Sequence, residues 1–202
     1  MNVRFQNTAA ARVNPVAAVL CWLTVALEGF DLVALGAVIP TLLSSGHLGM
    51  TRADLTFAAT ISLVGVGLGA AGVGPLADRF GRRYTLIACI VVFSIFTALL
   101  PLAGSVMLFC LLRFVAGLGL GACMPVALTM MSEVTPPQHR AKAATLTMTG
   151  YHVGAVATSL LALSVGAGWQ TIFYAGGVAG LLLVPVMWFL LPESSAVAAG
   201  EK

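Results

Sequence analysis

Long apolar segments, separated by short polar ones, make up most of this chain. A helix needs about 20 mostly apolar residues to cross the hydrocarbon core of a bilayer. Alternation of apolar and polar positions over about ten residues, which is typical of a transmembrane barrel strand, does not occur. The pattern predicts an all-α membrane protein with six transmembrane helices, at Pro15–Leu42, Leu55–Leu76, Tyr84–Leu102, Met107–Met131, Ala144–Val165 and Thr171–Leu191.

Turn-forming or charged residues separate the predicted helices. These separating stretches are 44–46, 78–83, 104–105, 136–142 and 166–169. Glycine, proline and serine favour turns, and charged residues favour water over the bilayer core. We therefore expect an N-terminal tail at 1–14, a helical bundle at 15–191 and a C-terminal tail at 192–202, with both tails in the cytoplasm.

The composition favours a bilayer rather than water as the surrounding solvent. Hydrophobic residues make up 59% of the 202 residues and charged residues only 8%, whereas soluble domains carry about 25% charged residues. The net charge of +3 is small and scattered, so we expect no nucleic-acid partner. Cysteines with metal-ligand spacing, a nucleotide-binding loop and an enzyme constellation are all missing from the sequence. We therefore expect no enzyme activity, no metal site and no cofactor.

Lysine and arginine are distributed unequally between the two ends of the predicted helices. One end carries Arg4, Arg12, Arg79, Arg82, Arg83, Arg140, Lys142 and Lys202, whereas the other carries only Arg52. Cytoplasmic loops of membrane proteins are enriched in these two residue types. We therefore expect a multi-pass protein of the cell (inner) membrane with both termini in the cytoplasm.

The loop between the second and third predicted helices is rich in glycine and arginine. It reads Gly74-Pro75-Leu76-Ala77-Asp78-Arg79-Phe80-Gly81-Arg82-Arg83. Glycines permit a tight turn, an aspartate caps or pairs at a helix end, and arginines bind the anionic leaflet of the lipid bilayer. The stretch resembles the G-x-L-a-D-r-x-G-r-r/k signature of the major facilitator superfamily of secondary transporters. The alternative is an ordinary loop of the cytoplasmic side.

Three further stretches are similar to the same superfamily. They are Arg113-x3-Gly117-x-Gly119-x-Gly121 in the fourth helix, Glu133 and Arg140 around the next loop, and Leu191-Pro192-Glu193-Ser194 after the sixth helix. The resemblance implies half of a transporter fold, built as a 3+3 inverted repeat. It also implies that Gly74, Asp78, Arg79, Gly81, Arg82, Arg83, Glu133 and Arg140 form a conformational motif. Their opposite charges predict that Glu133 and Arg140 pair with the Asp78–Arg83 cluster.

The first predicted helix narrows the resemblance to one branch. Glu28-Gly29-Phe30-Asp31 is similar to the D-G-x-D segment of the aromatic acid:proton symporters. This similarity implies secondary active uptake of a small aromatic carboxylate together with a proton. Glu28 departs from the branch pattern, which usually has aspartate there. A carrier of another organic anion or of a sugar is the alternative.

Charged residues inside the predicted helices are candidates for the transport chemistry. Such groups are costly at membrane depth and usually face a partner or a cavity. Glu28 and Asp31, three residues apart, share one helix face, and either could carry the proton or only line a polar channel. Asp31 lies about 13 Å and Arg113 about 10 Å from the outer ends of their helices, so an ion pair between them is possible. Arg113 could alternate between Asp31 and a substrate carboxylate, or form a fixed pair between helices.

His152, in the fifth predicted helix, is a further candidate for proton transfer. Histidine changes its charge near neutral pH, and the residue lies about 12 Å from the cytoplasmic start of its helix. A lone histidine beside Tyr151 is more often a satisfied polar group, and we favour that interpretation.

The length of the chain corresponds to one half of the transporter that it resembles. Superfamily members contain two six-helix halves related by an axis along the membrane normal. A truncated product that transports nothing, a fragment, and one partner of a split carrier are all open. We expect the face with Glu28, Asp31 and Arg113 to meet a second six-helix half or a second copy in a homodimer, because lipid tolerates these charges poorly. The alternative is a monomer whose charges pair internally or are neutralised.

Overall fold

Six long helices make up the computed structural model, which describes residues 14–166 and 168–192. They are α1 (Pro15–Ser44), α2 (Arg52–Phe80), α3 (Arg82–Leu99), α4 (Val106–Glu133), α5 (Arg140–Val165) and α6 (Gln170–Leu190). Short 3-10 helices in the connections span His47–Gly49, Leu100–Leu102 and Pro137–His139. All 6 long helices are apolar enough to cross a membrane, and the described residues include no strand. The predicted all-α, six-helix fold is confirmed.

Most of the two predicted tails lies outside the described residues, as do Glu193 and Ser194 of the motif after α6. Asn14 is described and begins the first helix. Its side-chain oxygen accepts a hydrogen bond from the backbone N–H of Val16 at 3.0 Å. This contact satisfies one of the free N–H groups that every helix leaves at its start.

The second helix is longer at both ends than its apolar run predicts. It begins at Arg52 instead of Leu55, because Thr51 and Asp54 form a capping box before the apolar run. The Asp54 carboxylate accepts the backbone N–H of Thr51 at 2.8 Å, which fixes the first turn. The helix ends at Phe80, where Gly81 adopts a φ of 87° that side chains other than glycine rarely adopt. Gly81 alone therefore makes the turn into α3.

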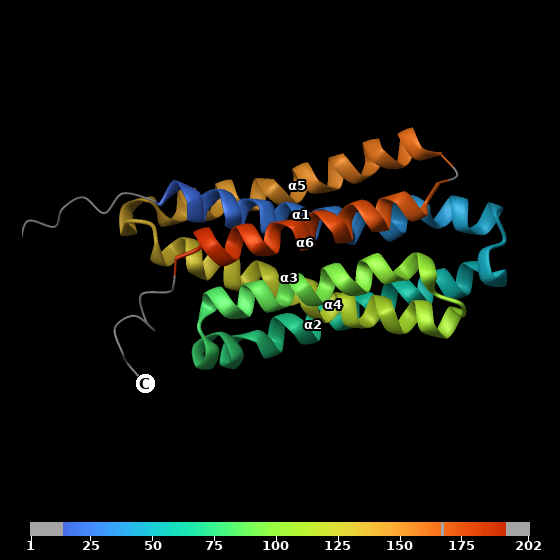
Figure 1. Cartoon of the computed structure of the whole chain (residues 1–202), viewed down its shortest axis with the longest axis horizontal. Helices are drawn as coiled ribbons and strands as arrows, with labels where there is room; N and C mark the ends of the chain where they lie inside the picture. Colours follow the sequence, from blue (N-terminus) through green and yellow to red (C-terminus); the bar gives the residue numbers. More distant parts are fainter. Residues whose placement is uncertain (1–13, 167, 193–202) are drawn as a thin grey trace, which may run out of the picture.

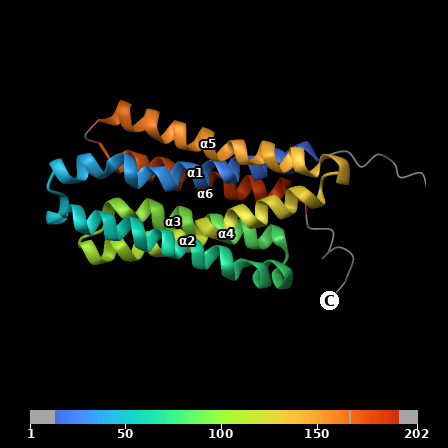
Figure 2. The same cartoon turned by 180° about the vertical axis from the view of Figure 1, so that it is seen from behind.

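All six helices run along the long axis of the bundle, so the connections gather at two opposite ends (Figure 1). One end holds the start of α1, the α2–α3 and α4–α5 connections and the end of α6, and the view from behind shows the same order (Figure 2). We call it the basic end, because its described cations are Arg79, Arg82, Arg83, Arg140 and Lys142. The opposite end carries Arg52.

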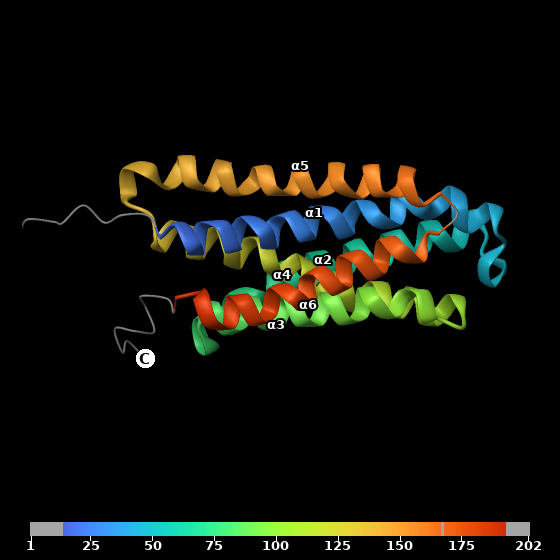
Figure 3. The same cartoon turned by 45° about the horizontal axis from the view of Figure 1, so that its top comes forward.

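Each of the first three helices packs against one of the last three. α5 packs along α1, α2 packs along α4, and α3 and α6 pack against each other (Figure 3). If α1–α3 are matched to α4–α6, the α1–α5 contact corresponds to the α4–α2 contact, as a 3+3 repeat requires. Glycine permits both close approaches. A Cβ atom on Gly154 would overlap the carbonyl of Ala26, and one on Gly121 would overlap the carbonyl of Val66.

Two buried apolar clusters fill the bundle, one toward each end. The cluster at the basic end includes Leu20 of α1 and Met130 of α4, and the other includes Leu35 of α1 and Phe109 of α4. Between them, α1 carries its two carboxylates. The core is therefore apolar toward both ends and polar in the middle. We call the buried Glu28, Asp31 and Arg113 the polar layer.

Candidate functional site

An ion pair between α1 and α4 lies in the polar middle of the bundle. Arg113 Nη1 donates to Asp31 Oδ2 at 3.0 Å, and both residues are only 1% exposed. The similar depth of the two residues in their helices made this contact possible, and the structure contains it. Charge-assisted hydrogen bonds are strong in such a dry setting. Loss of one partner would leave a buried, uncompensated charge.

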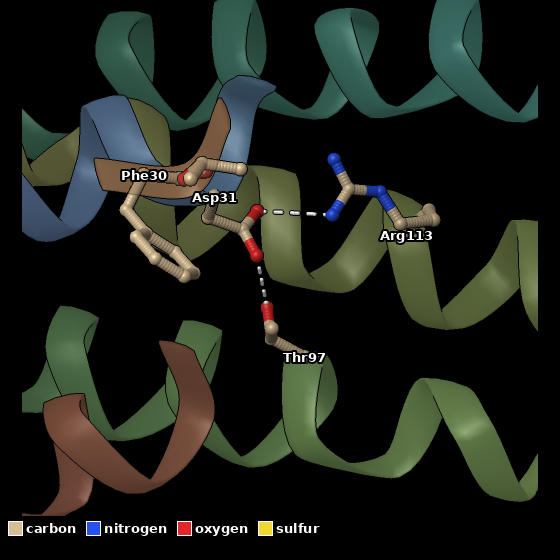
Figure 4. A network of polar contacts seen from close by, with 5 residues as sticks. Phe30, Asp31, Thr97 and Arg113 are labelled. Atoms are coloured by element: carbon tan, nitrogen blue, oxygen red, sulfur yellow. Dashed lines mark hydrogen bonds and ion pairs between the residues drawn. The ribbon is translucent and has the colours of Figure 1, made fainter. Parts of the chain in front are cut away.

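Thr97 of α3 is the third member of this group, and sequence analysis missed it. Its hydroxyl donates to Asp31 Oδ1 at 2.8 Å, so each carboxylate oxygen has one donor (Figure 4). Thr97 is buried as deeply as the ion pair. The carboxylate of Asp31 therefore joins α1, α3 and α4.

The backbone beside Asp31 is also held in place. Thr158 of α5 donates its hydroxyl to the Phe30 carbonyl oxygen at 2.7 Å. The Phe30 ring packs on α6, where a Cβ atom added to Gly176 would lie 3.0 Å from it. With the ion pair and Thr97, five of the six helices meet around Phe30 and Asp31 (Figure 4). A movement of Asp31 must therefore move several helices or break several contacts.

Glu28 lies one turn before Asp31 and is 4% exposed. Its Oε2 atom has no hydrogen-bond partner within the described residues, and Nε of Arg113 has none either. A buried carboxylate oxygen without a donor is costly when it is charged. Glu28 therefore differs from Asp31, whose two oxygens both accept hydrogen bonds.

The glycine- and arginine-rich loop forms a second polar group at the basic end. Arg82 forms an ion pair with Glu133 at the end of α4, as predicted. Arg83 donates to the carbonyl oxygen of Trp188, and its guanidinium carbon lies 5.6 Å from the ring centre of Tyr84. The loop thus ties α3, α4 and α6 together at the basic end.

The prediction for Arg140 is wrong. Its Nε donates to the carbonyl oxygen of Thr135 at 3.3 Å, and among the described residues it forms no ion pair. Arg140 faces its own connection because the 3-10 turn before α5 brings the Thr135 carbonyl within its reach.

The other residues of the loop are placed as follows. Asp78 is exposed and lines a cavity of about 80 Å³ that Gly74 and Arg82 also line. The guanidinium carbon of Arg79 lies 5.4 Å from the ring centre of Phe80.

The sequence comparisons decide the family of this chain. A family model described as Major Facilitator Superfamily matches residues 21–202. The chain belongs to the major facilitator superfamily. It is 39% identical over 178 residues to the 4-hydroxybenzoate transporter PcaK of Pseudomonas putida, covering 87% of this chain and 39% of that protein. It is 36% identical to the 3-(3-hydroxy-phenyl)propionate transporter of Escherichia coli, covering 91% of this chain and 45% of that protein.

Solved structures agree on the fold of this superfamily chain. The proton:xylose symporter XylE, bound to 6-bromo-6-deoxy-D-glucose, matches with a TM-score of 0.82 at 19% identity, over 97% of this chain and 48% of that chain. At this identity the likeness establishes the fold alone. The chain spans about two fifths of the length of the first curated relatives, from 39% to 41%. It is a multi-pass membrane protein with a half-sized superfamily fold.

The sequence argument for contact with a second bundle assumed that three charged residues lie on an open face, and that assumption is wrong. Glu28, Asp31 and Arg113 were expected on a face that meets a second bundle, but all three are buried inside the described bundle. Thr97 of α3 and Arg113 of α4 donate to Asp31, and α6 packs on Phe30 beside it. These charges therefore need no second chain to leave the lipid. Association with another half or another copy stays a prediction, without support from these residues.

His152 lies apart from the polar layer. It is exposed on α5, and its ring stands edge-on to Tyr151 with 5.6 Å between the ring centres. The described structure therefore does not bring it together with Asp31 and Arg113. Its predicted part in proton transfer is untested.

Proposed function

We propose that this chain forms half of a proton-coupled carrier that imports small aromatic carboxylates across the cell membrane. The observation that carries the proposal is its similarity, at 33–39% identity, to transporters named for 4-hydroxybenzoate, gallate and 3-(3-hydroxy-phenyl)propionate. A buried carboxylate–guanidinium pair supports it further, because arginine binds carboxylates well and a carboxylate can carry a proton.

In the proposed cycle, Arg113 exchanges Asp31 for the substrate carboxylate. Asp31 then loses its counter-charge and accepts a proton from the outer side, so the charge of the site is conserved. When the substrate leaves on the inner side, Arg113 returns to Asp31 and the proton is released there. Thr97 can donate to the charged carboxylate and accept from its protonated form. Because Asp31 and Arg113 are buried on different helices, the exchange requires α1 and α4 to move.

The orientation in the membrane is part of the same proposal. The basic end faces the cytoplasm, because lysine and arginine concentrate in cytoplasmic loops. Phe80 is an exposed residue at this end, so a cysteine there would be accessible to a reagent. In a chain without native cysteines, an impermeant thiol reagent should label position 80 only in opened cells. Labelling in intact cells would contradict the orientation.

Uptake of labelled substrate tests the transport proposal. The chain would be joined to the second half of the Pseudomonas putida 4-hydroxybenzoate transporter and expressed in cells that lack aromatic acid uptake. We expect accumulation of 4-hydroxybenzoate that a protonophore abolishes, and no accumulation of xylose. Correct insertion without accumulation would contradict the proposal, and accumulation of xylose alone would favour a sugar carrier.

The partial length favours one second candidate, a fragment that inserts in the membrane and transports nothing, with or without a second half. The relatives above are more than twice as long as the matched region. Expression of the 202-residue chain alone and together with a second half separates the two candidates. Accumulation by the chain alone would exclude the inactive fragment, and accumulation only with a second half would favour the half-carrier.

A further inference from the structure

A cavity of about 440 Å³ lies at the basic end, away from the ion pair. The start of α1, the end of α4 and the start of α5 surround it, with Trp22, Met131, Thr135, His139, Lys142 and Leu146 among its lining residues. Sites for small ligands are clefts of about 300–1,000 Å³ with mostly apolar walls and a few polar groups. Trp22 is nine residues before Asp31 on α1, about 13 Å along the axis. The cavity is therefore distinct from the polar layer.

The Trp22 ring forms a fixed wall of this cavity. Its Nε1 donates to the hydroxyl of Thr149 on α5 at 3.1 Å. The backbone behind it is also held, because a Cβ atom added to Gly150 would lie only 2.6 Å from the Trp22 carbonyl oxygen. A ring held in this way loses little freedom when a flat ligand packs against it.

Hydrogen-bond donors lie beside the apolar walls of this cavity. Lys142 and His139 are exposed cavity residues, and both can donate hydrogen bonds to an anion. Thr135 also lines the cavity, is 2% exposed, and has a hydroxyl without a partner among the described residues. Burying an unpaired hydroxyl is costly. The start of α5, which has no side-chain cap, adds the positive end of a helix dipole beside Lys142.

We propose that this cavity binds the aromatic carboxylate on the cytoplasmic side, as a second site that substrate occupies on its way out. The ring packs against Trp22, and the carboxylate meets Lys142 and His139, with Thr135 as a further hydrogen-bond partner. This inference rests on the proposed function, because it takes the same substrate class. A flat ring bearing one negative charge matches a fixed indole beside the exposed Lys142 better than a flexible phospholipid chain does.

Photolabelling of the purified 202-residue chain with 4-azidobenzoate tests the site. We expect covalent adducts within 18–22 and 131–147, and protection of these adducts by excess benzoate. Lys142→Gln should weaken labelling about two- to fivefold, as expected for one exposed charge contact. Ala143→Leu, which fills a lining position of the cavity, should remove the labelling. Arg52→Gln, a matched loss of charge at the opposite end, should leave it unchanged.

Each other outcome has a defined meaning. Adducts that appear only near Arg113, or that benzoate does not protect, overturn the second site. Protection by phosphatidylglycerol, but not by benzoate, would make the cavity a lipid site and also overturn it. If the joined carrier transports 4-hydroxybenzoate while the cavity labels at no residue, the inference fails and the proposed function stands. If the cavity labels as expected while the joined carrier inserts without transport, the proposed function fails.

Discussion

Within the described residues, two arginine–carboxylate pairs join helices of this chain, and their surroundings differ. Arg113 and Asp31 join α4 to α1 in the middle of the bundle, with each side chain 2% exposed. Arg82 and Glu133 join α3 to α4 at the basic end, with side chains 20% and 18% exposed. Salt screens exposed charges more than buried ones. The proposed cycle therefore uses the buried pair for its proton step, and we expect the exposed pair only to align helix ends.

The largest expected effect follows from breaking the buried pair. Arg113→Met leaves Asp31 without a counter-charge and should lower the free energy of unfolding by about 3–5 kcal/mol. The double variant Arg113→Met with Asp31→Leu should recover most of this loss, because no buried charge remains. Unfolding in detergent, followed by circular dichroism, measures both. A single variant as stable as the parent chain would contradict the buried ion pair.

A smaller effect is expected from the hydroxyl that supports Asp31. Thr97→Val keeps the shape of the side chain and removes a hydrogen bond to a charged group, which costs about 1.5–3 kcal/mol. In the joined carrier, we expect Thr97→Val to lower the maximal rate of proton-driven uptake with little change in KM. Thr97→Ser, which keeps the hydroxyl, should restore most of the rate. Equal rates in the valine and serine variants would show that packing, and not the hydroxyl, is what matters.

The smallest effect is expected from the exposed pair. Glu133→Arg should destabilise the chain by roughly 0–1 kcal/mol, because solvent screens the charges. The paired reversal Glu133→Arg with Arg82→Glu should restore part of this stability, and high salt should reduce the difference. Thermal unfolding in detergent at low and high salt measures both effects. Absence of any recovery in the double variant would remove the pair as a contact between α3 and α4.

The sequence predicted the features that depend on distance along a helix. The thickness of the bilayer sets the length of a spanning helix, so all six helices were predictable. The depths of Asp31 and Arg113 follow from a constant rise per residue, so their contact was predictable as well. The ends of α2 were not, because the capping box of Thr51 and Asp54 and the turn at Gly81 extend the helix beyond its apolar run.

The features that depend on how helices pack could not be predicted in this way. Thr97 was missed because a threonine in an apolar helix usually bonds to its own backbone. Thr24 does so, with its hydroxyl 2.9 Å from the Leu20 carbonyl oxygen, whereas Thr97 reaches Asp31 on another helix. The burial of the whole polar layer inside this chain was only the alternative interpretation, for the same reason. It depends on how α3, α4, α5 and α6 pack around Phe30 and Asp31, which no residue of α1 reveals.

The most direct test of the proposed coupling is accumulation of 4-hydroxybenzoate by the joined carrier with Asp31→Asn. Asparagine keeps the size of the side chain and an acceptor for Arg113, but it cannot carry a proton. We expect insertion and the movement of substrate down its own concentration gradient to persist. Proton-driven accumulation should be lost. Glu28→Asp, the matched control, should accumulate substrate as the parent does. Undiminished accumulation in Asp31→Asn would contradict the assignment and make His152 the next candidate.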